Sequence, residues 1–153
     1  MSFMVLLPAL YFLLIFSYGS LLMLSSPSKL NPELKYRTLW LSIGYALIGL
    51  VIYLSLTPHI PTPGGIEIND KLSHVLAYAV LMGWFSQLYH RSYYKQIAFL
   101  LIIMGISLEF FQSMTGYRYM EFLDVIANSC GVFMGWLLSI TPLGRVLKVT
   151  NEW

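Results

Sequence analysis

Charged side chains are scarce in this sequence. Only 10% of the 153 residues are Asp, Glu, Lys or Arg, whereas 58% are hydrophobic and the mean hydropathy is +0.70. Soluble domains carry roughly 25% charged residues, and a soluble protein of this length has too small an interior to bury so much apolar surface. The composition excludes a water-soluble fold and predicts an integral membrane protein with one domain, residues 1–153.

Several features that would point to a familiar chemistry are missing. The one cysteine, Cys130, has no partner in the chain and cannot form an intrachain disulfide. A net charge of +2 is too small to indicate a nucleic-acid partner. The sequence contains no G-x-S-x-G motif, no glycine-rich phosphate loop and no Cys–His pair at a catalytic spacing. Neither a nucleophilic enzyme nor a cofactor is expected.

Long hydrophobic runs are present instead. A membrane-spanning helix needs roughly 20 apolar residues, and five segments qualify: 4–24, 39–58, 71–89, 96–115 and 122–140. The first run has no basic segment before it, so we interpret it as a retained helix rather than a signal peptide. We predict an all-α protein of five transmembrane helices. In this division, residues 1–38 are an extra N-terminal helix with a basic loop, 39–141 the helical core and 142–153 a cytoplasmic tail.

Basic residues in the short connections predict the orientation. Lys and Arg near helix ends stay on the cytoplasmic side of a membrane. In a five-helix chain, seven of them fall on one face: Lys29, Lys35, Arg37, Arg91, Lys95, Arg145 and Lys148. The predicted topology therefore places the N-terminus outside and the C-terminus inside, and only Lys71 and Arg118 are left for the outer face.

Polar residues interrupt the last three segments and the loop before the fifth. An ionisable group in hydrocarbon costs several kcal/mol, so such residues persist mainly where they pair with each other or perform a task. The predicted topology brings them together at the outer end of the third, fourth and fifth helices, in the outer leaflet. The set comprises Asp70, Lys71, His74, Tyr78, Glu109, Gln112, Arg118, Asp124 and Asn128.

The fifth segment also carries a stripe of small residues. Ala127, Gly131 and Gly135 recur every four residues, and this small-x-x-x-small pattern lets two helix backbones approach closely. Asn128 lies next to the stripe. The spacing predicts that the polar residues lie where the third, fourth and fifth helices pack together.

The charged residues of the third segment each have a structural and a functional interpretation. Asp70 is either the N-cap of the helix, where it would accept backbone N–H groups, or a direct functional group. Lys71 is better explained as a side chain that extends to the lipid head groups than as a catalytic residue. His74 is a structural residue, a general base or a metal ligand.

Glu109 is the hardest residue to explain as structural, because it lies deepest and has no cation on its own helix face. It either pairs with Arg118 or His74, or it serves as an acid–base group, a role that His74 could share. Gln112 and Asn128 would orient these groups by hydrogen bonding in either scheme.

The charge of the predicted set restricts its ligands. With Glu121 included, the carboxylates outnumber the cations, so the set is net acidic. A site for a lipid phosphate should be net basic, unless one carboxyl is protonated; self-neutralisation, proton transfer or cation binding therefore suit the set better. His74, Glu109 and Asp124 could supply three metal ligands, but no metal-binding motif is present and no metal site is predicted.

Together, the motifs resemble those of the VanZ-like family of small bacterial membrane proteins. The resemblance is carried by Leu54-Ser55-Leu56-Thr57-Pro58, Asp70-Lys71-x-x-His74, Glu109-x-x-Gln112, Arg118 and Asp124-x-x-x-Asn128-x-x-Gly131-x-x-x-Gly135. It covers about residues 45–139 and leaves the first helix outside. It implies a multi-pass protein of the bacterial inner membrane, with a link to the cell envelope and to resistance against the glycopeptide antibiotic teicoplanin.

Two functions are open. In the first, which the missing nucleophile favours, the protein is a non-catalytic module whose polar residues bind membrane lipids, an envelope precursor or a larger membrane complex. In the second, which the number of ionisable groups at one depth favours, it is a small enzyme that acts on a lipid-linked or amphiphilic substrate at the outer leaflet. Glu109 or His74 would then be the acid–base residue, and Arg118 would hold an anionic group.

Overall fold

Four stretches of the chain are described in the computed structural model: residues 29–32, 34–57, 69–114 and 121–142. The elements are α2 (Arg37–Leu56), α3 (Asp70–Leu88), the 3-10 turn η1 (Arg91–Tyr93), α4 (Tyr94–Met114) and α5 (Phe122–Ser139). Within these stretches the one strand-like contact is an isolated bridge between Leu30 and Tyr89. The all-α prediction is confirmed for the described residues. The first predicted helix, residues 4–24, lies outside them.

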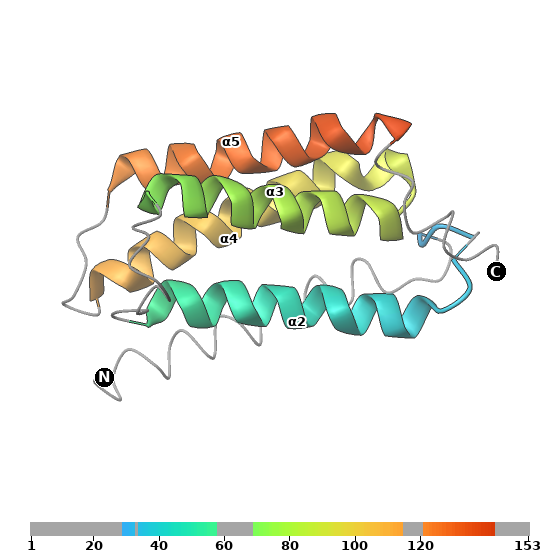
Figure 1. The fold of residues 1–153 in the computed structure, drawn as a ribbon, viewed down its shortest axis with the longest axis horizontal. Coiled ribbons are helices and arrows are strands. Elements are labelled where there is room, and N and C mark those ends of the chain that lie inside the picture. The colour runs from blue at the N-terminus through green and yellow to red at the C-terminus, as the bar shows by residue number, and fades with distance from the viewer. Residues whose placement is uncertain (1–28, 33, 58–68, 115–120, 143–153) are drawn as a thin grey trace.

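The four long helices lie side by side in one bundle (Figure 1). α3 and α4 occupy the middle, and each packs against the three other helices, whereas α2 and α5 lie on opposite sides. Because successive helices run in alternating directions, α3 and α5 begin at the end where α2 and α4 finish, on the left of Figure 1. This arrangement positions the polar residues at one end of the bundle.

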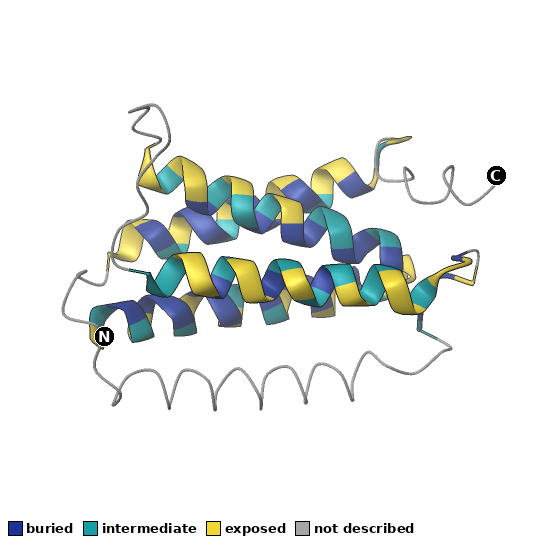
Figure 2. Cartoon of the chain, turned by 60° about the horizontal axis from the view of Figure 1, so that its bottom comes forward, coloured by how far each residue is buried: buried dark blue, intermediate teal, exposed yellow. Residues whose placement is uncertain are grey.

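Three helical stretches are long and apolar enough to cross a membrane: Arg37–Leu56, Arg91–Met114 and Phe122–Ser139. Their length and composition support a multi-pass membrane protein. Exposed residues run along the outward sides of the helices and buried residues along the inward sides (Figure 2). Most large exposed side chains on these outward sides are apolar, as expected of surfaces that face lipid.

α3 differs from the other helices in how its polarity is distributed. It is not among the three apolar stretches, because ionisable residues occupy its first two turns. Of those residues His74 is buried, whereas Asp70 is exposed and Lys71 partly exposed at the end of the helix. Leu72, Leu76 and Val80 form an exposed apolar stripe at four-residue spacing.

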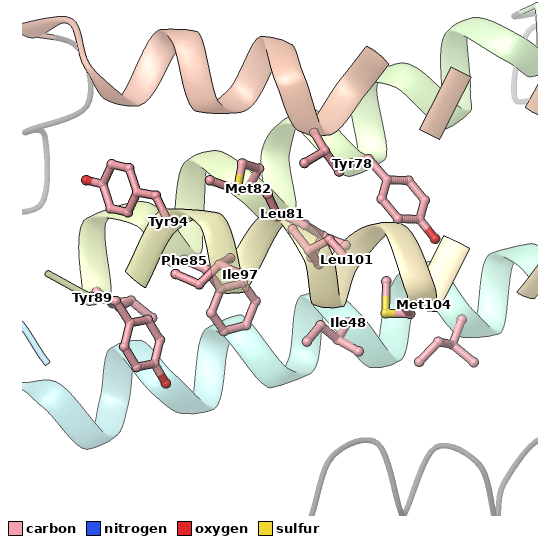
Figure 3. Packing of buried hydrophobic residues seen from close by; sticks show 14 of the residues in the cluster. Ile48, Tyr78, Leu81, Met82, Phe85, Tyr89, Tyr94, Ile97, Leu101 and Met104 are labelled. Carbon is pink, nitrogen blue, oxygen red and sulfur yellow. The ribbon is translucent and has the colours of Figure 1, made fainter. Parts of the chain in front are cut away.

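The inward sides of α2, α3 and α4 form an apolar core (Figure 3). In a bilayer such packing is stabilised by van der Waals contact rather than by removal of apolar surface from water. The core reaches from Tyr89 and Tyr94 near one end of the bundle to Met104 and Tyr78 near the polar end. The labelled members are Ile48, Tyr78, Leu81, Met82, Phe85, Tyr89, Tyr94, Ile97, Leu101 and Met104.

α3 begins at a side-chain cap, which is Asn69 rather than Asp70, the residue for which a cap was one of two predicted roles. Asn69 Oδ1 accepts a hydrogen bond from Lys71 N at 3.0 Å, which satisfies one of the N–H groups left open at a helix start. Asp70 is already the first helical residue, so its side chain lies along the helix toward His74 instead of folding back over the first turn. The interpretation of Asp70 as the N-cap is therefore wrong.

α3 and α5 form the most extensive helix contact among the described elements. Gly131 and Gly135 of α5 lie directly against the α3 backbone. A Cβ atom added at Gly135 would be 2.5 Å from Ala79 O, and one at Gly131 would be closer still to Val75 O. Neither position can accommodate a side chain larger than hydrogen. The stripe of small residues therefore allows the α3 and α5 backbones to approach closely. Ala127, the third member of the stripe, is also buried.

Candidate functional site

Seven polar residues gather where α3 and α5 begin and α4 ends. We call them the polar cluster: Asp70, Lys71, His74, Glu109, Glu121, Asp124 and Asn128. Three helices and the residue before α5 contribute to it, so the cluster depends on the assembled bundle rather than on any one segment.

His74 lies at the centre of the polar cluster. Its Nδ1 atom is 3.0 Å from Asn128 Oδ1 and 3.9 Å from Glu109 Oε1, and its Nε2 atom is 3.9 Å from Asp70 Oδ2. Because a carbonyl oxygen only accepts hydrogen bonds, Nδ1 carries the proton that is donated to Asn128. The other ring nitrogen, Nε2, faces the Asp70 carboxylate.

Lys71 links the start of α3 to the start of α5. Its Nζ atom donates hydrogen bonds to Glu121 Oε2 at 2.7 Å and to Asp124 Oδ1 at 3.3 Å. The expectation that Lys71 extends to the lipid head groups is therefore replaced by an ion pair across two helices. Asp124 is almost fully buried, with 1% of its surface exposed, and a buried carboxylate is stabilised when a cation and hydrogen bonds accompany it.

Exposure decreases inward through the polar cluster. The side chains of Asp70 and Glu121 are each 55% exposed, that of His74 is 10% exposed, and that of Glu109 is 2% exposed. A polar ligand can thus reach the outer carboxylates directly, whereas Glu109 lies on the floor of the cluster behind His74. This order follows from the helix positions, because Glu109 lies more than one turn before the end of α4.

Of the remaining predicted site residues, Gln112 and Tyr78 lie within the part of the chain that the structure describes. Gln112 is buried, but its Nε2 atom donates to Ser55 O at 2.7 Å and so ties α4 to the last turn of α2. Tyr78 lies one turn further along α3 than His74, and its hydroxyl borders the cluster: that hydroxyl and the Asn128 amide nitrogen lie 3.2 and 3.1 Å from the position that a Cβ atom at Gly105 would take. Arg118 lies outside the described residues, so its predicted pairing with Glu109 stays a prediction.

Glu121 belongs to the polar cluster although it is not among the predicted site residues. Glu121 stands three residues before Asp124, a spacing that places both carboxylates near one another at a helix start. This spacing could have identified Glu121 from the sequence. The contact of Gln112 could not be predicted in the same way, because its acceptor is the backbone carbonyl oxygen of Ser55, and backbone groups leave no side-chain pattern in a sequence.

One subset of the polar cluster has the composition of a metal site. Asp70, His74 and Asp124 each offer a ligand atom, and these atoms lie within 4.8 Å of one another. This set differs from the one weighed from the sequence, because Asp70 takes the place of Glu109. Carboxylate oxygen and imidazole nitrogen are donors that Zn²⁺ and Mn²⁺ accept.

Comparison with known proteins identifies the family. The sequence profile of the VanZ/LLP1 family matches residues 3–145. The chain belongs to the VanZ/LLP1 family. The match includes the first predicted helix and extends beyond the residues 45–139 that carry the recognised motifs.

A relative of this VanZ/LLP1 protein occurs in a fungus. It is an uncharacterized protein of Schizosaccharomyces pombe, 28% identical over 126 residues, and the alignment covers 80% of this chain and 74% of the relative. No solved structure matches. The relative's name carries no activity, and a location in the bacterial inner membrane stays a prediction.

Proposed function

We propose that this VanZ/LLP1 protein is a non-catalytic membrane module whose polar cluster binds the head group of a membrane lipid in the outer leaflet. The observation that carries the proposal is the convergence of ionisable groups from three helices, graded from half-exposed carboxylates to a sealed Glu109. A head group would enter beside Asp70 and Glu121, and His74 with Glu109 would form the floor of its site.

The charge of the polar cluster favours a head group that carries an ammonium. Among the described members of the polar cluster, four side chains are carboxylates and Lys71 is a cation. Lys71 donates hydrogen bonds to two of these carboxylates. An ammonium beside the outer carboxylates would offset this excess, as in phosphatidylethanolamine. A link to teicoplanin resistance would follow if the polar cluster bound an envelope precursor at this same place.

Binding in the outer leaflet requires the five-span topology. The apolar stripe of Leu72, Leu76 and Val80 supports α3 as a further span, since it would face lipid while the polar residues face the bundle. The basic residues Arg37, Arg91 and Lys95 lie at the end of the bundle opposite the polar cluster. Under the positive-inside rule that end is cytoplasmic.

Cysteine labelling checks this topology. With Cys130 replaced by serine, we expect a cysteine at Gly65, between α2 and α3, to react with a membrane-impermeant reagent added to intact cells. A cysteine at Ser92, an exposed residue of η1, should react only after permeabilisation. The reverse pattern would place the polar cluster in the cytoplasmic leaflet.

Lipid retention tests head-group binding. Native mass spectrometry of the detergent-purified protein should detect bound phosphatidylethanolamine. Its retention should fall about tenfold in His74→Ala and in Glu109→Gln, which corresponds to a loss of about 1.4 kcal/mol in binding free energy. Ser113→Ala is a matched control, because its hydroxyl donates only to Phe110 O within α4. Equal retention in all four proteins, once each is shown to be folded, would end the proposal.

The enzyme alternative is favoured by a different observation, namely the 3.9 Å approach of His74 Nδ1 to the buried Glu109 Oε1. Paired groups of this kind can exchange a proton with a substrate. The Glu109→Gln variant separates the two functions. If it retains lipid but loses turnover of an amphiphilic substrate, Glu109 is a catalytic residue; if it loses retention and no turnover is measured in the unaltered protein, the cluster is a binding site.

A further inference from the structure

The outer part of the polar cluster has an arrangement that head-group binding does not explain. Asp70 and His74 are one turn apart on α3, and Asp124 lies opposite them in the first turn of α5. One donor atom from each lies within 4.8 Å of the other two. We propose that Asp70, His74 and Asp124 bind a divalent transition-metal ion, which goes beyond the proposed lipid binding.

The orientation of His74 suits a metal ligand. Asn128 Oδ1 accepts the Nδ1 proton at 3.0 Å, which holds the ring with Nε2 directed toward Asp70 Oδ2 at 3.9 Å. A histidine that donates one ring N–H to a carbonyl and offers the other nitrogen to an ion is the usual arrangement in protein metal sites.

The distances need only a small adjustment. An ion about 2.1 Å from each of three ligands keeps the ligands about 3.5 Å apart. The side chain of Asp70 is 55% exposed and can rotate inward without disturbing the core. Its exposure also provides an entry path for the ion from the aqueous side.

The charges around the three ligands match a divalent ion. Lys71 donates to both Glu121 and Asp124, and Lys71 with Glu121 forms a neutral pair. Asp70 and Asp124 supply the carboxylate oxygens of the ligand set, which are donors that suit Zn²⁺ or Mn²⁺. Binding of the ion there would leave Lys71 with its partners.

Three protein ligands leave a coordination position open for an outside oxygen atom. A net-acidic cluster repels a phosphate, but a bound divalent ion would accept one. Metal binding therefore lets the same end of the bundle meet both the ammonium and the phosphate of a zwitterionic head group. This consequence rests on the proposed function, whereas metal binding itself does not.

Titration of the full-length protein in detergent tests the metal site. After treatment with a chelator and its removal, we expect calorimetry with ZnCl₂ to give one ion per chain. The affinity should fall at least tenfold in Asp70→Asn and in His74→Ala, the lower end of the range for loss of a group from a metal site. His90→Ala is the matched control, since His90 is an exposed histidine next to η1 at the far end of the bundle.

Asp70→Asn keeps the test decisive, because Asp70 is exposed and its replacement should leave the fold intact. Binding of equal affinity in Asp70→Asn and the unaltered protein would overturn the proposal, as would the absence of stoichiometric Zn²⁺ binding. Lipid retention measured with and without chelator separates the two proposals. Retention that is unaffected by chelator in a protein that binds no Zn²⁺ would leave head-group binding standing and end the metal site alone.

Discussion

Gly131→Ala is expected to be among the most destabilising single-atom additions in this protein. The new methyl group would meet the carbonyl oxygen of Val75 and the Cβ atom of Tyr78, so α3 and α5 would have to move apart. Overpacking of this kind costs typically 1–3 kcal/mol, and here the obstacle is backbone rather than a flexible side chain. We expect a loss of about 3 kcal/mol in the free energy of unfolding, measured by denaturation in mixed detergent micelles.

Gly49→Ala provides the control for this prediction. Gly49 lies in α2, and nothing lies within 4 Å of the position that its Cβ atom would take. Alanine is favoured over glycine within a helix by up to about 1 kcal/mol, so Gly49→Ala should leave stability unchanged or raise it. Equal losses from both substitutions would show that the α3–α5 contact is not close-packed at Gly131.

Asn128→Leu should have the second-largest effect. It removes the acceptor of the His74 Nδ1 proton at a site where Asn128 is only 2% exposed. Leaving a buried donor unsatisfied costs about 1–3 kcal/mol, and the ring loses the contact that fixes its orientation. We expect the unfolding free energy to fall by about 2 kcal/mol and both Zn²⁺ affinity and lipid retention to fall with it.

Ser129→Ala is the neighbouring control for Asn128→Leu. The Ser129 hydroxyl donates to Val125 O within α5, so its removal should change the unfolding free energy by less than about 0.5 kcal/mol. Asn128→Asp would test the direction of the hydrogen bond, because a carboxylate also accepts from Nδ1. Retention of stability in Asn128→Asp, together with its loss in Asn128→Leu, would assign the effect to the acceptor rather than to packing.

The helices could be predicted from the sequence because hydrophobic length is a strong signal. The segment predicted at 39–58 is Arg37–Leu56, and that predicted at 122–140 is Phe122–Ser139. The start of α3 could not be assigned in the same way. Asn69 and Asp70 are both good cap residues, and only backbone conformation decides which of them stands outside the helix.

The gathering of His74, Asp124 and Asn128 could be anticipated because their spacings and the alternating helix directions place them at one end. The approach of His74 to Glu109 was one of the predicted alternatives, but other partners could not be predicted. Gln112 was grouped with the others by its spacing from Glu109, yet it bonds a backbone carbonyl of α2. Side-chain direction around a helix decides such contacts, and a linear sequence does not specify how each helix is rotated toward its neighbours.

The uneven polarity of α3 bears on how the chain enters a bilayer. A helix that begins with Asp70 and Lys71 is a poor substrate for partition into lipid by itself. Lys71 finds its carboxylate partners, and His74 its amide, only when α5 has been synthesised. Under the proposed five-span topology, stable insertion of α3 would therefore be a late event that depends on α5, and the charged residues of the candidate site would set the order in which the bundle is assembled.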